Sequence, residues 1–148
     1  MDDIDREILK KLTENSRINY TELGKMLNLS RVAIKDRVEK LKKEKVIEKF
    51  TIIVNPEAVG KNISAYFEID VDPFFLDEVA VKLSKEKEVE NLYLMTGSST
   101  LHMHALFQDM KALEKFVFDT VYSLRGITKV QTNTLLKRYK SKSGGTRL

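Results

Sequence analysis

Apolar residues in the first third of the chain recur at the three- and four-residue spacings of amphipathic helices. The pattern predicts a first helix capped by Asp2 or Asp3, a second capped by Thr21, and a third from about Arg31 to Glu44 capped by Ser30. The positions expected to face inward are Ile4, Ile8, Leu9 and Leu12, then Leu23, Met26 and Leu27, then Ile34, Val38 and Leu41.

The connection between the second and third predicted helices is very short. Asn28 tolerates the left-handed backbone of a tight turn, and only Leu29 separates it from the Ser30 cap. Gly24 carries no side chain, so the second helix can approach the third closely. Two helices joined in this way, the second of them basic, are typical of a helix-turn-helix, which places its second helix in the major groove of DNA.

After the helices, residues 46–54 (VIEKFTIIV) are rich in β-branched and aromatic side chains and predict a strand. Beyond Pro56 and Gly60 the pattern reads strand, helix, strand, strand, helix, strand. This βαββαβ order predicts a ferredoxin-like α+β sandwich with both helices on one face of an antiparallel sheet. The elements expected there are strand 64–71, a helix from Pro73, strands 89–95 and 101–107, a helix capped by Asp109, and strand 129–136.

The domain organisation follows from these patterns. We expect a three-helix helix-turn-helix domain over 1–49, a β-strand linker over 50–60, a ferredoxin-like domain over 61–139 and a flexible basic tail over 140–148.

The second face of the predicted sheet is not clearly polar. One face of strand 101–107 carries Leu101, Met103, Ala105 and Phe107, and the other carries His102, His104 and Leu106. A half-exposed apolar sheet is a liability in a monomer. We therefore expect a second copy of the chain to cover this face, and the strand over 46–54 to pair with its counterpart across the same two-fold axis.

Basic residues are unevenly distributed. Residues 30–49 carry 8 basic and 4 acidic side chains and residues 137–148 carry 5 basic and none acidic, whereas residues 50–136 carry 8 and 12. The net charge of +4 therefore lies mainly on the third helix and the tail. Together with the helix-turn-helix pattern, this distribution indicates double-stranded DNA as the partner of the N-terminal domain.

Several functional classes are excluded or disfavoured. The 148 residues contain no cysteine, which excludes disulfides, thiolate zinc sites and cysteine nucleophiles. Membrane-spanning and signal-peptide runs are absent from the sequence, so we expect a cytoplasmic protein with no membrane partner. His102 and His104 point to one strand face but lack an obvious third ligand, so we expect neither a metal nor another cofactor.

Taken together, these features resemble the Lrp/AsnC family of transcription regulators, also called feast/famine regulators, over about residues 1–139. The residues that carry the resemblance are Ile4–Leu9, Leu29–Arg31, Arg37–Leu41, Val46–Ile47, Val54–Gly60, the Gly97 loop and Gly126–Thr134. The resemblance implies a sequence-specific DNA-binding regulator whose C-terminal domain pairs through its sheet and often senses an amino acid. It also implies a homodimer that assembles further to a tetramer or octamer.

The chain departs from the family pattern in three places. Lys45 replaces the glycine usual before Val-Ile, so we expect that helix end not to adopt the left-handed cap. Asp36 stands where a basic residue is commoner. The loop that usually reads Gly-Asp-Tyr-Asp is Gly97-Ser98-Ser99-Thr100 here. An acid of that loop can meet the ammonium group of the effector, so its loss opens the choice between an amino acid, a different ligand and none.

Candidate DNA contacts cluster at the start of the third helix. Ser30, Arg31, Val32 and Lys35 are expected to face base edges or adjacent phosphates. Tyr20 and Thr21 begin the second helix, where a hydroxyl and free N–H groups suit a phosphate, and Lys40 adds unspecific attraction.

Two residues of the third helix have alternative roles. Asp36 is either a cytosine reader or, as we prefer, an intramolecular partner of Lys40. Arg37 is either a DNA contact or a structural residue bonded to the first helix or its loop.

The candidate effector site comprises Gly97, Ser98, Ser99 and Thr100, with Thr132 and Thr134 as weaker candidates. Hydroxyls and backbone N–H groups there can hold a carboxylate. The alternative is an ordinary serine-rich hairpin that binds nothing.

Two rival functions stay open at this point. Siroheme decarboxylases share the two-part architecture, but they tend to carry Ile-Arg-Arg where this chain reads Ile47-Glu48-Lys49, and no catalytic arrangement is evident, so an enzyme is not expected. The other rival is an architectural DNA packager with no effector and little sequence preference.

Overall fold

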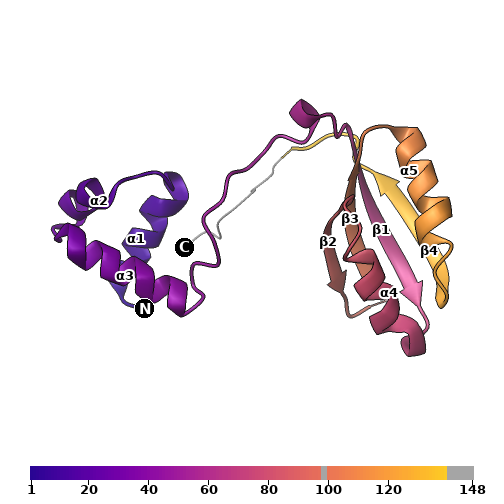
Figure 1. Cartoon of the computed structure of the whole chain (residues 1–148), viewed down its shortest axis with the longest axis horizontal. Helices are drawn as coiled ribbons and strands as arrows, with labels where there is room; N and C mark the ends of the chain where they lie inside the picture. The colour runs from indigo at the N-terminus through magenta and orange to yellow at the C-terminus, as the bar shows by residue number, and fades with distance from the viewer. Residues whose placement is uncertain (98–99, 140–148) are drawn as a thin grey trace. The chain divides into compact units, whose positions relative to one another are not determined.

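The computed structural model describes residues 1–97 and 100–139. Contacts divide the chain into two compact units, residues 1–53 and a second unit that begins at Val54. The first contains three helices and the second a four-stranded sheet with helices, as the sequence predicts (Figure 1). Among the described residues, no helix has the length and apolar character needed to cross a membrane.

The helical unit consists of α1 (Asp3–Glu14), α2 (Tyr20–Leu27) and α3 (Arg31–Lys43). Asp2 caps α1 in a reciprocal capping box with Asp5. Ser30 caps α3 as predicted, because its hydroxyl accepts a hydrogen bond from the Ala33 N–H at 3.1 Å. The predicted cap of α2 is wrong. Asn19 rather than Thr21 supplies it, since the Asn19 carboxamide oxygen accepts from the Glu22 N–H at 2.9 Å.

The turn between α2 and α3 has the predicted geometry. Asn28 adopts the left-handed conformation with φ of 54°. A Cβ placed on Gly24 would lie 2.5 Å from the backbone oxygen of Leu29, so only glycine permits this contact. The three helices enclose a core of fully or almost fully buried side chains: Ile8, Leu9, Leu12, Leu23, Ile34, Val38 and Leu41.

The end of this unit contradicts one expectation and leaves another as a prediction. Lys45 does adopt a left-handed conformation, with φ of 57°, although it lacks the conformational freedom of glycine. Residues 46–54 form no strand within the described chain. A strand requires hydrogen bonds to a neighbouring strand, and in a single chain the side chains of Phe50, Ile52 and Ile53 stay exposed. Because the expected neighbour is the same segment of a second copy, the strand stays a prediction.

The sheet unit contains β1 (Ile63–Val71), α4 (Leu76–Leu83), β2 (Val89–Leu94), β3 (Leu101–Phe107), α5 (Met110–Phe116) and β4 (Ile127–Thr134). Short 3-10 turns cover Glu57–Val59 and Pro73–Phe75, and a π-helical turn, Val117–Val121, extends α5. Asp109 caps α5 as predicted, accepting from the Ala112 N–H at 2.8 Å. The strands are antiparallel in the order β2-β3-β1-β4, which is the ferredoxin-like arrangement (Figure 1).

Both helices pack on the same side of the sheet. The hydrophobic core there is formed by Phe67 and Ile69 of β1, Met103 and Phe107 of β3, and buried residues of both helices. Side chains alternate along a strand, so the intervening residues of β1 and β3 lie on the opposite face. That face, here called the open face, is defined by Ser64, Tyr66, Glu68, Asp70, His102, His104 and Leu106.

Candidate DNA interface and effector site

The first two turns of α3 bring most of the predicted DNA contacts together. Arg31 and Lys35 are four residues apart and lie next to each other on the helix surface. Both are exposed, and so is Val32, with 65% of its side chain accessible. The opposite side of α3 is buried in the core through Ile34. The helix therefore presents a fixed surface with two cations and one apolar group.

Asp36 lies on this exposed surface, but it does not pair with Lys40 as we preferred. Lys40 instead lies 3.9 Å from the Glu44 carboxylate, one helical turn further on. The intramolecular alternative for Asp36 therefore does not describe this structure. Its carboxylate is exposed beside the cations of the helix start.

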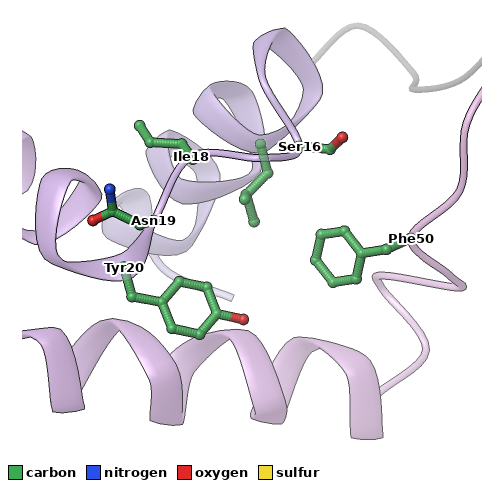
Figure 2. Close-up of a pocket in the computed structure, with 6 residues that line it drawn as sticks. Ser16, Ile18, Asn19, Tyr20 and Phe50 are labelled. Carbon is green, nitrogen blue, oxygen red and sulfur yellow. The ribbon is translucent and has the colours of Figure 1, made fainter.

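The two candidates at the start of α2 differ in their surroundings. Thr21 is exposed and has no capping role. Tyr20 is half-buried and packs against the helical core. Its ring borders an open pocket of about 310 Å³, with Phe50 on the other side (Figure 2). The other residues that line the pocket are Leu12, Ser16, Ile18 and Asn19.

Arg37 has the structural role that the sequence left as one of two alternatives. Its Nη1 donates hydrogen bonds of 2.7 Å both to Asp2 and to Asp5, which belong to the capping box of α1. Asp5 is only 2% exposed, so Arg37 neutralises a buried carboxylate. The sequence did not reveal this ion-pair cluster, although an acidic residue at the third position of a helix is a known capping signal.

The ion pairs shift the pKa of all three groups. Burial alone would raise the pKa of Asp5, but hydrogen bonds from the Asp2 N–H and from Arg37 outweigh it and hold that pKa below its ordinary value. The pKa of Asp2 is lowered by the Asp5 N–H and by Arg37. The two carboxylates in turn raise the pKa of Arg37.

The candidate effector residues do not form one cluster within a single chain. Gly97 is exposed with φ of 143°, and the Thr100 hydroxyl accepts a 3.4 Å hydrogen bond from the Val71 N–H. Ser98 and Ser99 lie outside the described residues. Thr134 pairs with Ala65, six residues from Val71 along β1, which corresponds to about 20 Å.

Thr132 and Thr134 also differ from the turn in the face they occupy. Thr132 pairs with Phe67 and Thr134 with Ala65, and both of these β1 residues face the hydrophobic core. The two threonines are therefore on the helix side of the exposed strand β4.

The two histidines lie on the open face, as predicted. His104 stacks on Tyr66, with ring centroids 4.5 Å apart, and its Nε2 lies 2.8 Å from the Ser64 hydroxyl. Burial lowers the pKa of His104, against the opposing influence of Glu90 and with a smaller contribution from Arg138. Within the described ranges, no group of three or more His, Asp or Glu side chains could hold a metal ion.

Comparison with known proteins identifies the family to which both units belong. Residues 1–42 match the AsnC-type helix-turn-helix domain, and residues 64–144 match the Lrp/AsnC ligand binding domain. The fold and the exposed basic helix thus define a helix-turn-helix transcription regulator with a ligand-binding domain. The chain belongs to the Lrp/AsnC family.

Relatives cover nearly the whole chain. An HTH-type transcriptional regulator of Pyrococcus horikoshii is 33% identical over 135 residues, which are 91% of this chain and 85% of the relative. The HTH-type transcriptional regulator FL11 of Pyrococcus furiosus is 34% identical over 140 residues, 95% of this chain and 92% of the relative.

Solved structures agree with the fold. Escherichia coli AsnC matches with a TM-score of 0.92 and 26% identity, covering 97% of both chains. A Neisseria meningitidis transcriptional regulator, solved as a complex with L-Met, matches with a TM-score of 0.91 and 27% identity, covering 97% of this chain and 94% of that one.

Proposed function

We propose that this regulator binds double-stranded DNA sequence-specifically, with the start of α3 in the major groove. The observation that carries the proposal is the exposed surface of Arg31, Val32 and Lys35 on a helix whose other side is buried. A buried side fixes the helix, so its exposed side chains meet the DNA in one register.

Each contact residue has a defined chemical role in this proposal. Arg31 reads guanine through a bidentate contact, Val32 contacts a thymine methyl group, and Asp36 accepts from a cytosine amino group. Ser30, Lys35, Thr21 and the Tyr20 hydroxyl contact phosphates or nearby base edges, and Lys40 adds unspecific attraction. Arg37 acts indirectly, because its guanidinium is bound to α1.

A gel-shift titration with Arg31→Ala and Lys35→Ala tests this placement. Arg31→Ala is expected to weaken operator binding by about tenfold or more and to relax base preference, whereas Lys35→Ala lowers affinity for all sequences. Lys82→Ala, which removes the same charge from α4, is the control. Unchanged operator affinity in both α3 variants at moderate salt would contradict the proposal.

The open sheet face supports pairing of two copies. Tyr66 and Tyr93 offer aromatic surface that a single chain leaves 46% and 57% exposed, and His104 stacks on Tyr66. Pairing through it gives a homodimer that presents two α3 helices to two half-sites, and further assembly gives a tetramer or octamer. Analytical ultracentrifugation tests this, and a chain that stays monomeric at micromolar concentration would contradict it.

An amino acid is the effector class we propose, bound at the turn that includes Gly97 and Thr100 and, in sequence, Ser98 and Ser99. The proposal is supported by the match to a ligand-binding domain and by the L-Met complex of the Neisseria relative. Thr132 and Thr134 can contribute only if another copy brings them near, since they lie far from the turn of their own chain. Calorimetry with a panel of L-amino acids tests the proposal. If none of them gives a heat of binding, the turn is an ordinary serine-rich hairpin that binds no effector.

The proposal treats the protein as a cytoplasmic DNA-binding regulator and not as an enzyme, in line with relatives that are transcriptional regulators. An architectural packager would bind operator and unrelated DNA with similar affinity. A specific affinity at least about a thousandfold above the non-specific one distinguishes a regulator from a packager.

A further inference from the structure

His104 lies in the middle of the open face. It is the fourth of the seven residues of β3, and β3 is an inner strand of the sheet, between β2 and β1. Its paired neighbours are Tyr66 of β1 on one side and Asn91 of β2 on the other. A second copy that covers the open face therefore also covers His104, whereas a residue at the rim of the face would keep its contact with water.

Two contacts with β1 fix the imidazole within one chain. Its ring stacks on the Tyr66 ring, with centroids 4.5 Å apart and an angle of 18° between the ring planes. Nε2 lies 2.8 Å from the Ser64 hydroxyl, which can donate a hydrogen bond to a neutral imidazole. The His104 side chain is already half-buried in a single chain. The site thus accommodates an uncharged ring.

Charged groups beyond these contacts act on the imidazole in opposite directions. Burial is the largest influence and lowers the pKa of His104, the Glu90 carboxylate raises that pKa, and the Arg138 guanidinium lowers it. Glu90 also has a cation as partner, since the Lys61 ammonium lies 3.2 Å from its carboxylate. The positive charge of Lys61 offsets part of the attraction between Glu90 and a protonated imidazole.

The groups closest in the strand register give a proton on His104 no carboxylate partner. The residues directly opposite, Tyr66 and Asn91, carry no carboxylate. Glu68 of β1 is paired with His102, the other histidine of this face, and not with His104. Protonation would therefore place a cation in the middle of an aromatic surface with no acid directly across from it.

We propose that His104 makes the pairing of two copies dependent on pH: the neutral imidazole permits a second copy to cover the open face, and the protonated imidazolium opposes it. The inference rests on the proposed pairing through this face and adds its regulation. Covering the face removes water from the imidazolium, and an ion that loses water without gaining a partner is disfavoured. Each pair contains two copies of His104, so the effect acts twice. Acidification is thus expected to dissociate the dimer and to weaken operator binding.

Sedimentation equilibrium of the full chain at pH 7.5 and pH 5.5 tests this inference. Histidine is the side chain that ordinarily changes charge in this range, and the chain contains two histidines. The wild-type chain is expected to associate roughly 10-fold or more weakly at pH 5.5 than at pH 7.5. His104→Gln, which is neutral at both pH values, is expected to associate with the same affinity at both.

His102→Gln is the matched control, because His102 lies on the same face of β3 two residues away. It is expected to keep the pH dependence of the wild-type chain. Calorimetric dilution of the wild-type chain at pH 6 needs no variant, so the inference stays testable if His104→Gln does not fold. Dissociation is expected to take up protons, which appears as a heat that differs between buffers of different ionisation enthalpy.

The outcomes separate this inference from the pairing on which it rests. A chain that stays monomeric at pH 7.5 overturns the pairing and this inference with it. A dimer whose affinity is equal at both pH values, or whose dissociation takes up no protons, overturns the inference alone. A dimer that is tighter at pH 5.5 also overturns it, since a second copy then supplies a carboxylate to His104. So does a pH dependence that His102→Gln abolishes and His104→Gln keeps.

Discussion

The helical unit closes its hydrophobic core within one chain, whereas the sheet unit leaves a whole face of its sheet open. In the three helices of the first unit, Ile8, Leu23 and Ile34 are fully buried. In the second, the core side is equally well packed, but Tyr66 and Tyr93 remain 46% and 57% exposed on the other side. The difference shows that the three helices complete their core within one chain, whereas the second face of the sheet has no covering layer in a single chain, which is why we propose that a second copy packs there.

The largest loss of stability is expected from a substitution on the packed side of the sheet. Phe67 is 1% exposed and lies between the rings of Phe107 and Phe116. Phe67→Ala is expected to cost about 3–5 kcal/mol, a large share of a domain's stability. Hydrogen exchange should show lost protection in the sheet unit and unchanged protection in α1 to α3.

Phe118→Ala, at a 61% exposed aromatic residue, is the control and should cost less than about 1 kcal/mol. Equal loss of protection in both units would show that they do not fold independently.

A smaller effect, on association and not on folding, is expected from the open face. Tyr66→Lys places a charge where we propose that a second copy packs, and it is expected to weaken the dimer by about tenfold or more. Sedimentation equilibrium measures the change. Phe118→Lys makes the same substitution at an exposed aromatic outside the open face. If the two variants weaken association equally, the open face is not the contact.

The two units are also expected to lose stability at different pH. His104 has a pKa below its ordinary 6.5, so the unfolded chain binds more protons and the sheet unit loses stability as the pH falls from about 6.5 toward the lowered value. The lowered pKa of Asp2 and Asp5 implies that their ion pairs stabilise the helical unit fully above pH of about 4 and are lost below it.

Thermal melts of the two units, followed by NMR at pH 7.5, 5.5 and 3, check this order. His104→Gln should remove the decline of the sheet unit between the first two conditions. If the helical unit loses stability at a higher pH than the sheet unit, His104 and the Asp2 and Asp5 ion pairs do not control the two units as predicted.

The smallest change in stability is expected from a substitution at the end of α3. Lys45 adopts φ of 57°, which costs a residue with a side chain about 1 kcal/mol. Lys45→Gly should therefore raise the stability of the helical unit by about that amount, measured by denaturant unfolding. Lys42→Gly, inside α3, removes the same side chain from a regular helix and should destabilise by up to about 1 kcal/mol. A destabilised Lys45→Gly variant would mean that the lysine side chain itself stabilises the turn.

Features determined by near neighbours were predictable from the sequence. Ser30 and Asn28 have the expected cap and turn conformations because both depend on the adjacent backbone. The alternation Leu101, Met103, Ala105, Phe107 correctly assigned the core face of β3. Thr21 was mistaken for a cap because Asn19, two residues earlier, makes the same kind of hydrogen bond.

Features that depend on distant partners were not predictable. The apolar run 46–54 has strand composition, but no neighbouring strand pairs with it in the described chain. Arg37 contacts residues 32 and 35 positions away, so periodicity could not decide its role.

The contact between Gly24 and the Leu29 backbone also bears on how such a protein could acquire new targets. At the turn between α2 and α3 backbone packs directly on backbone, because a Cβ at position 24 would lie 2.5 Å from the Leu29 oxygen. Exchanges among the outward side chains of α3 leave that contact untouched. Duplicated copies could thus diverge in the sites they recognise while inheriting one unchanged scaffold.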